Sequence, residues 1–149
     1  MAVSPAALAV GEDTGAQRVW GEIVGPAYFD VMRIQPAAGR FFAGAERGDE
    51  QNAHAVVVIS HSFWQRHFNS DNNVVGKTIL LDSVPHTVIG VLPRSFRFPD
   101  SGLQPDLIVS PDLPLFSGDP NQPMLIVNVI GRMKPGVTKD RAAAELTGL

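Results

Sequence analysis

The middle of the chain carries a continuous apolar run, followed at once by a serine and an aromatic-rich segment. Ala55–Ile59 includes four consecutive β-branched residues, the pattern of a short strand covered on both faces. Ser60 is a preferred helix N-cap, and a short helix is expected over His61–Phe68. Ile59 and Trp64 then stand at the two positions of a hydrophobic staple. The helix face expected to meet the core consists of Phe63, Trp64, His67 and Phe68.

Short elements surround this strand-helix unit. Extended segments or strands are predicted over Ala6–Val10, Gln17–Val24, Lys77–Leu81, His86–Leu92, Asp106–Val109 and Met124–Met133. Helical turns are predicted over Ala27–Met32, and a last helix is capped by Thr138, with Ala142, Leu146 and Leu149 on one face. The 14 glycines and 12 prolines supply the turns between them. Strands interspersed with short helices in this order indicate the α+β class with mixed sheets.

Composition excludes several functional classes. The net charge is −3 and the basic residues are scattered, so the sequence offers no basic stripe for nucleic acid. Cysteine is absent, which rules out disulfides and thiolate chemistry. No apolar run approaches the roughly 20 residues that a bilayer-spanning helix needs. Composition alone therefore predicts a soluble cytoplasmic chain, an expectation that the resemblance below replaces.

A search for chemistry finds no catalytic, cofactor or metal pattern. The four histidines are His54, His61, His67 and His86, and none of them belongs to a metal-binding motif. Ser60 and Ser62 follow a buried strand as a hydrolase nucleophile does, but the Gly-x-Ser-x-Gly motif is absent and N-capping accounts for Ser60. The acid pairs Glu12/Asp13 and Asp49/Glu50 fall in turn-like segments. We therefore expect a protein that is not an enzyme.

The segment 94–104 is a candidate functional segment in a sequence that otherwise shows no functional motif. Phe96, Phe98 and Leu103 are large apolar residues between proline-marked breaks, where exposure to water is costly. Two interpretations remain open. The side chains pack beneath their own loop, or they form a patch that binds a partner.

Five motifs, in order, resemble the signatures of the MacB-like periplasmic core domain of FtsX-type ABC transporter permeases. They are Val24–Phe41, Val56–Phe68, Val75–Asp82, His86–Pro93 and Val129–Thr138. Together they cover roughly residues 18–149 and consist of glycine turns, core aromatics and proline breaks, which specify a fold rather than a reaction. Ile108 departs from the family, which commonly has tryptophan at that position.

The resemblance implies a fold, a location and a role. The fold is α+β with two small lobes, a porter-like βαβ lobe and a β-rich lobe. Residues 1–149 would be a single extracytoplasmic domain fragment that lacks the family's first strand and helix and both flanking transmembrane helices. It would stand at the periplasmic face of the bacterial inner membrane in a macrolide- or lipoprotein-exporter-like permease. There it would couple ATP-driven conformational change to a periplasmic adaptor or substrate.

The resemblance also implies partners and leaves one alternative. The partners would be an ABC ATPase subunit or domain, a periplasmic adaptor and a second copy of the permease, with neither cofactor nor metal. Because adaptors in this family meet the membrane-distal end, the candidate partner-binding residues are Arg94, Phe96, Arg97, Phe98 and Leu103. The alternative is a free-standing small-ligand-binding module, which an apolar pocket closed by residues 94–104 would support.

Overall fold

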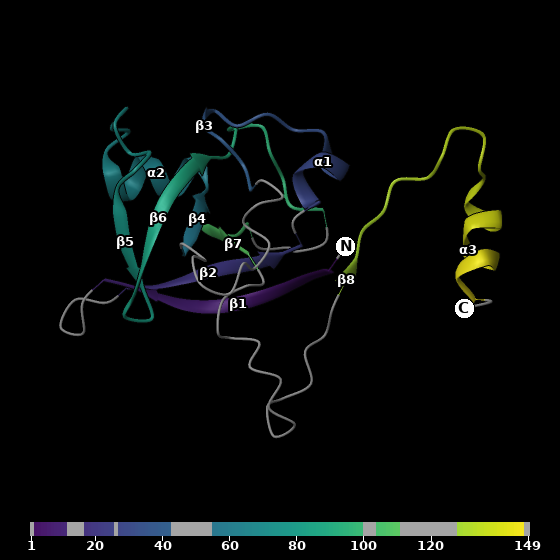
Figure 1. The fold of residues 1–149 in the computed structure, drawn as a ribbon, viewed down its shortest axis with the longest axis horizontal. Helices are drawn as coiled ribbons and strands as arrows, with labels where there is room; N and C mark the ends of the chain where they lie inside the picture. The colour runs from purple at the N-terminus through teal and green to yellow at the C-terminus, as the bar shows by residue number, and fades with distance from the viewer. Residues whose placement is uncertain are drawn as a thin grey trace, which may run out of the picture.

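A computed structural model describes residues 2–11, 17–25, 27–42, 55–99, 104–110 and 128–147 of the chain (Figure 1). The helices are α1 (Tyr28–Met32), α2 (His61–Phe68) and α3 (Lys139–Thr147). The strands are β1 (Ala2–Val10), β2 (Gln17–Val24), β3 (Ala38–Gly39), β4 (Val56–Ile59), β5 (Thr78–Leu81), β6 (Val84–Val91), β7 (Leu107–Val109) and β8 (Asn128–Val129). This mixed α+β architecture agrees with the class predicted from the sequence.

Six of the strands pair in a closed ring. The order runs β2-β7-β4-β6-β5-β1, and β1 then pairs with β2 along its length, which completes the ring. The β2–β7 and β4–β6 pairs are parallel and the others are antiparallel. β3 pairs with β6, and β8 pairs with β1. Because a closed ring pairs each of its strands on both sides, it limits the open edges at which sheets aggregate.

The ring closes between β1 and β5 at one point, which is reinforced by the β5–β6 turn. Val10 pairs with Leu81, and the N–H of Asp82 donates to the carbonyl of Ala9 at 2.9 Å. In return the carboxylate of Asp82 accepts the N–H of Ala9 at 2.8 Å. Asp82 and Ser83 both have positive φ, 48° and 67°, as the tight hairpin turns that match strand twist require.

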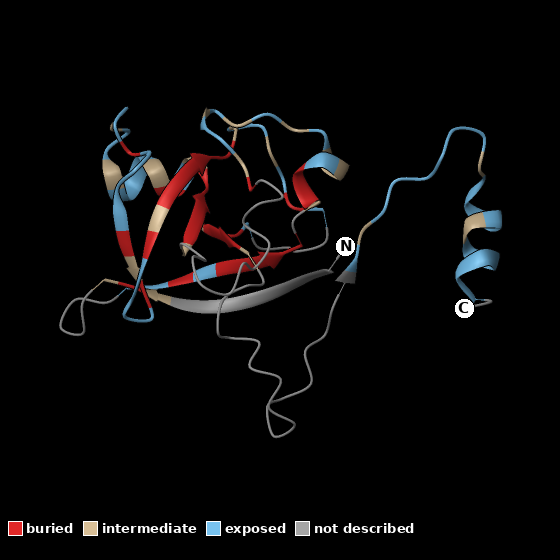
Figure 2. Cartoon of the chain, viewed as in Figure 1, coloured by how far each residue is buried: buried red, intermediate tan, exposed pale blue. Residues whose placement is uncertain are grey.

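Two apolar clusters cover the two faces of the sheet. The first takes side chains from all six strands of the ring and from α2: Val10, Val19, Ile23, Val57, Ile59, Phe63, Val74, Ile79, Leu81, Val88, Val91, Leu107 and Val109. The second lies beneath α1: Val24, Tyr28, Phe29, Phe42, Val56, Val58, Ile89, Leu92, Phe98 and Ile108. Neighbouring residues of β4 alternate between the clusters and all are buried (Figure 2). The prediction of a strand covered on both faces is therefore confirmed, and Ile108 of the neighbouring β7 is fully buried in the second cluster.

The strand-to-helix turn at Ser60 also agrees with the sequence. The Ser60 hydroxyl accepts the N–H of Phe63 at 3.1 Å, and Asn69 ends α2 in the left-handed conformation. The helix face was predicted less well. Phe63 is its only buried member, whereas Trp64 and Phe68 are half-buried and His67 is exposed. Trp64 and Phe68, predicted as core residues, do pack against the first cluster, but both remain partly exposed.

The last part of the chain departs furthest from expectation. The long strand expected over Met124–Met133 is not present in its described part, where only Asn128–Val129 is a strand; residues 124–127 lie outside the described residues. α3 forms where expected, and the Thr138 hydroxyl accepts the N–H of Arg141 at 3.4 Å. No residue of α3 is buried, and it stands apart from the sheet in Figure 1.

Candidate functional site

The ends of three neighbouring strands come together at one end of the sheet. β4 and β6 are parallel, so their last residues, Ile59 and Val91, lie side by side. β7 runs the opposite way beside β4, so its first residue Leu107 pairs with Ile59. The segments that follow β4 and β6 and the segment that precedes β7 therefore emerge at the same place.

Backbone hydrogen bonds fix these three segments to one another. The N–H of Leu92 donates to the carbonyl of Ile59 at 2.9 Å, and the N–H of Ser60 donates to the carbonyl of Asp106 at 2.8 Å. Across the same junction, the guanidinium of Arg66 contacts the carboxylate of Asp106 at 2.6 Å. The start of α2, the turn after β6 and the approach to β7 consequently form one rigid surface.

Two of the candidate partner-binding residues are packed into the domain. Phe98 is 5% exposed and its ring stacks on that of Tyr28 at 5.3 Å between centroids. Phe96 is half-buried and meets the rings of Tyr28 and Phe98 edge to face, at 6.5 and 5.9 Å. Both phenylalanines therefore pack against Tyr28 of α1.

The other three candidate residues are Arg94, Arg97 and Leu103. Arg94 and Arg97 are exposed. One nitrogen of Arg97 donates to the carbonyl oxygens of Arg94 and Phe96, at 2.8 Å each, so this side chain ties its own turn together. Arg94 has no ion pair within the described part of the chain. Leu103 lies outside the described residues, and Gln104 after it accepts the N–H of Phe98 at 3.0 Å.

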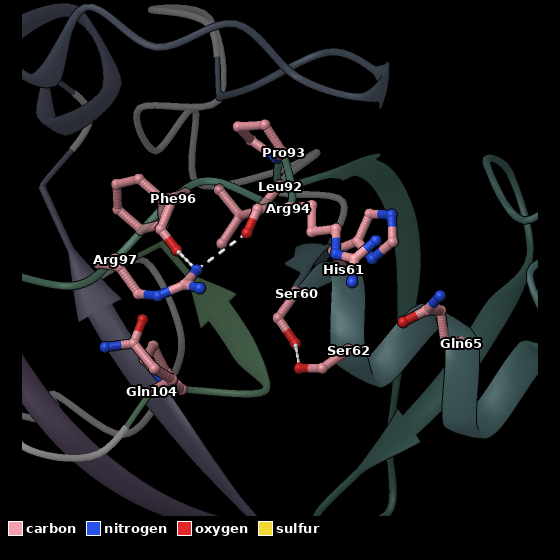
Figure 3. A pocket seen from close by; sticks show the side chains of 11 residues that line it. Ser60, His61, Ser62, Gln65, Leu92, Pro93, Arg94, Phe96, Arg97 and Gln104 are labelled. Atoms are coloured by element: carbon pink, nitrogen blue, oxygen red, sulfur yellow. Dashed lines mark hydrogen bonds between the residues drawn. The ribbon is translucent and has the colours of Figure 1, made fainter.

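A cleft of about 350 Å³ opens between the start of α2 and the segment that follows β6 (Figure 3). It is lined by Ser60, His61, Ser62, Gln65, Leu92, Pro93, Arg94, Phe96, Arg97, Gln104 and Pro105. The lining is mixed, with two arginines, two serines, two glutamines and a histidine beside apolar groups. The cleft therefore combines polar groups with the apolar surface that the small-ligand alternative called for.

The serines in the cleft have a structural explanation. The Ser60 hydroxyl accepts from Phe63 and lies 3.0 Å from the hydroxyl of Ser62 (Figure 3). No hydrogen bond joins either serine to a histidine among the described residues. The Ser60 oxygen thus serves as the cap of α2, and the arrangement lacks the base that a serine nucleophile needs.

The histidines are dispersed. His54 lies outside the described residues, and His61 and His67 contact Trp64 and Phe63 through their rings. His86 is fully buried, and its Nδ1 lies 2.8 Å from the carbonyl of Val84. Burial lowers the pKa of His86 below its usual value, against the opposing effects of that carbonyl and of Asp82. Over the described residues, no three His, Cys, Asp or Glu side chains lie together as a metal site.

The sequence did not identify the α2 side of the cleft. Ser60, His61, Ser62 and Gln65 are far along the chain from Arg94, and only the pairing of β4 with β6 brings them together. One signal was available: segments after adjacent parallel strands meet at the same sheet edge. Using it required knowing that β4 and β6 pair, although α2 and β5 lie between them in the sequence.

The structure resembles solved extracytoplasmic domains of ABC transporters. The periplasmic region of MacB from Actinobacillus actinomycetemcomitans matches 99% of this chain and 63% of that chain, with a TM-score of 0.66 and 21% identity. The extracellular domain of the transporter YknZ from Gram-positive bacteria matches 78% and 57%, with a TM-score of 0.58 and 18% identity. The chain thus shares the fold of these solved domains. More narrowly, the chain belongs to the MacB-like periplasmic core domain family, whose model matches residues 1–149.

Curated relatives are export proteins. The pyoverdine export ATP-binding/permease protein PvdT of Pseudomonas syringae pv. syringae is 44% identical over 67 residues, 45% of this chain and 9% of that protein. The macrolide export ATP-binding/permease protein MacB of Neisseria gonorrhoeae is 38% identical over 71 residues, 48% of this chain and 10% of that protein. The matches span only about a tenth of the length of these relatives. The relatives are transporter permeases, and no catalytic activity is indicated for the matched part.

Family membership implies an extracytoplasmic location. This replaces the cytoplasmic expectation drawn from composition. Among the described helices, none has the length and apolar character needed to cross a bilayer.

Proposed function

We propose that residues 1–149 form one extracytoplasmic domain of an ABC exporter permease, standing at the periplasmic face of the bacterial inner membrane. The domain is not catalytic and passes ATP-driven conformational change to a periplasmic adaptor or substrate. The observation that carries the proposal is the match of the periplasmic core domain family over the whole chain. The export relatives add support for the transporter context.

The mechanism is a rigid-body movement of two domain copies, driven by an ATPase subunit or domain elsewhere in the transporter. The closed ring of strands supports this mechanism, because a sheet buried on both faces transmits displacement rather than absorbing it. We further propose two lobes. The parallel β4–β6 pair with α2 is the βαβ element that favours a porter-like lobe, and the remaining strands would contribute to a β-rich lobe. The cargo class is that of macrolide- or lipoprotein-exporter-like permeases.

The partner surface is the exposed part of the segment 94–104. Arg94 and Arg97 project from it, and Phe96 is half-exposed between them. Phe98 supports this surface from inside through Tyr28, and Leu103 is retained from the sequence-based proposal.

Export by the complete permease tests this function. Arg94→Glu reverses a charge on the surface and leaves the aromatic packing intact, so export should fall while the melting temperature of the domain stays unchanged. Phe98→Ser removes a buried ring and should lower both. Normal export with Arg94→Glu together with Phe96→Ala would contradict docking at this segment. Normal export after deletion of the whole domain would contradict the proposed function.

The small-ligand-binding module remains a second candidate because of the cleft. Its volume of about 350 Å³ falls at the lower end of the range of ligand pockets. Its mixed lining disfavours an apolar ligand. A small molecule that raises the melting temperature of the isolated chain, in a gene context without permease helices or an ATPase, would favour this candidate.

A further inference from the structure

The cleft between α2 and the turn after β6 has an unusual balance of hydrogen-bonding groups. None of its 11 lining residues is acidic, although the chain as a whole carries a net charge of −3. Two of the lining residues are arginines, and Arg94 is exposed and has no ion pair with any described residue. The local charge of the cleft is therefore opposite to that of the whole chain.

The cleft has more hydrogen-bond donors than the acceptors around it use. Within the described part of the chain, only one nitrogen of Arg97 is bound to carbonyl oxygens, and the other guanidinium N–H groups are not used by these two bonds. Gln104 uses its oxygen for the N–H of Phe98, so its NH₂ group is not engaged by that bond. The hydroxyls of Ser60 and Ser62 share one hydrogen bond, and whichever donates, the other keeps its proton.

These groups come from elements that cannot move apart freely. Arg94 and Arg97 follow β6, the serines begin α2, and Gln104 precedes β7, while the backbone bonds at Ile59 and Asp106 lock the three together. Figure 3 shows the guanidinium of Arg97 facing the two serines across the cleft. The backbone that carries these donors is thus held in place before any ligand arrives, which reduces the entropic cost of binding.

We propose that this cleft binds a carboxylate-bearing segment of a partner protein, with Arg94 as the principal charged contact. A carboxylate matches a lining that contains two arginines and no acidic residue, since each oxygen accepts several hydrogen bonds and the guanidinium binds it with two parallel ones. Phe96 and Leu92 supply an apolar wall for the chain that carries the carboxylate. This inference rests on the proposed function, and it specifies the chemistry of the partner that the proposal leaves general.

The test uses the 149-residue chain and a pair of short peptides. The probe is acetyl-Gly-Asp-Glu-Asp-Gly-amide, and its control is acetyl-Gly-Asn-Gln-Asn-Gly-amide, which has the same shape without charge. In a ¹⁵N–¹H NMR titration the acidic peptide should shift the resonances of His61, Ser62 and Gln104, and the neutral peptide should not. Arg94→Gln should weaken binding by about tenfold or more, as loss of a charged hydrogen bond does.

Matched variants keep the test specific. Arg141→Gln on α3 removes the same charge far from the cleft and should leave binding unchanged. Arg94→Lys should retain part of the affinity, because lysine keeps the charge but not the two-pronged geometry. Unchanged melting temperatures confirm that the variants fold.

Three results would overturn the inference. They are equal binding of both peptides, equal weakening by Arg94→Gln and Arg141→Gln, and binding of inorganic phosphate at these residues with no binding of the acidic peptide. If binding fails while export still requires the domain, the inference is wrong and the proposed function stands.

Discussion

The backbone N–H of Leu92 donates to the carbonyl of Ile59 at 2.9 Å, which joins the residue after β6 to the last residue of β4. This bond continues the parallel pairing beyond the end of the ladder. It sets the turn that carries Arg94 directly beside the first turn of α2, and so creates the cleft. The cleft therefore results from strand pairing, and the strand-to-helix turn at Ser60 forms its α2 side.

Phe63 rather than Trp64 should anchor α2. Phe63 is 1% exposed, so Phe63→Ala should lower the free energy of unfolding by about 3–5 kcal/mol, as large aromatic truncations do. Trp64 is half-buried and its indole N–H donates to the carbonyl of Asp71 at 2.8 Å, so Trp64→Ala should cost less. Urea unfolding of both variants measures the difference. A larger loss for Trp64→Ala would show that the helix is anchored differently.

The Ser60 hydroxyl should contribute as a helix cap. Ser60→Ala should destabilise the domain by about 1 kcal/mol, because the N–H of Phe63 loses its acceptor in a buried position. Ser62→Ala is the matched control; Ser62 is exposed, so its change should stay within about 0.5 kcal/mol. Denaturant midpoints of the two variants decide the point, and equal midpoints would argue against the cap.

The close contact between β3 and β6 should require glycine at position 90. A Cβ built on Gly90 would clash with the carbonyl oxygen of Arg40, a backbone atom that cannot move without disturbing the strand pair. Gly90→Ala should therefore cost roughly 1–3 kcal/mol or more, as overpacking does. At Gly131 an added Cβ has nothing within 4 Å, so Gly131→Ala provides the control. Thermal melting compares the two, and a stable Gly90→Ala variant would contradict the contact.

Stability should fall on mild acidification because of His86. Its Nδ1 carries the proton that the carbonyl of Val84 accepts, and its buried Nε2 has no hydrogen-bond partner among the described residues, so the folded state favours the neutral ring. The pKa of His86 is lowered from about 6.5, and the unfolded chain therefore binds a proton that the folded chain does not. The contribution of neutral His86 to the free energy of unfolding is fully present above pH ~6.5. It is lost as the pH falls through the lowered pKa of the folded state.

Two histidine variants measure the acid effect. The free energy of unfolding of the parent chain should drop between neutral and mildly acidic pH. His86→Gln should reduce that pH dependence, although the variant is less stable overall. His67→Gln, at an exposed site, should retain the parent's pH dependence. Identical pH profiles for the three proteins would exclude His86 as the source.

Local chemistry of the chain was enough to predict most of its elements. Three elements formed as expected because they depend on neighbours in the sequence. They are the β-branched strand Val56–Ile59, the helix cap at Ser60 and the short strand that ends at Val109. The motifs also led to the family, since glycine turns and core aromatics at fixed spacing identify a backbone. The length of the strand near Val129 was overestimated, because an apolar run does not show whether a partner strand will pair with it.

The sequence by itself therefore determined the class, the family and the strand-to-helix turn, because caps, turns and β-branched runs act over a few residues. Only the tertiary structure decided the closure of the ring and the burial of Trp64 and Phe98. It also decided that Arg94 lies beside the start of α2. Each of these depends on which strands pair and which helix face is covered. Burial and charge proximity are properties of contacts between distant segments, and no local pattern at Arg94 specifies that Ser60 and Ser62 lie across the cleft from it.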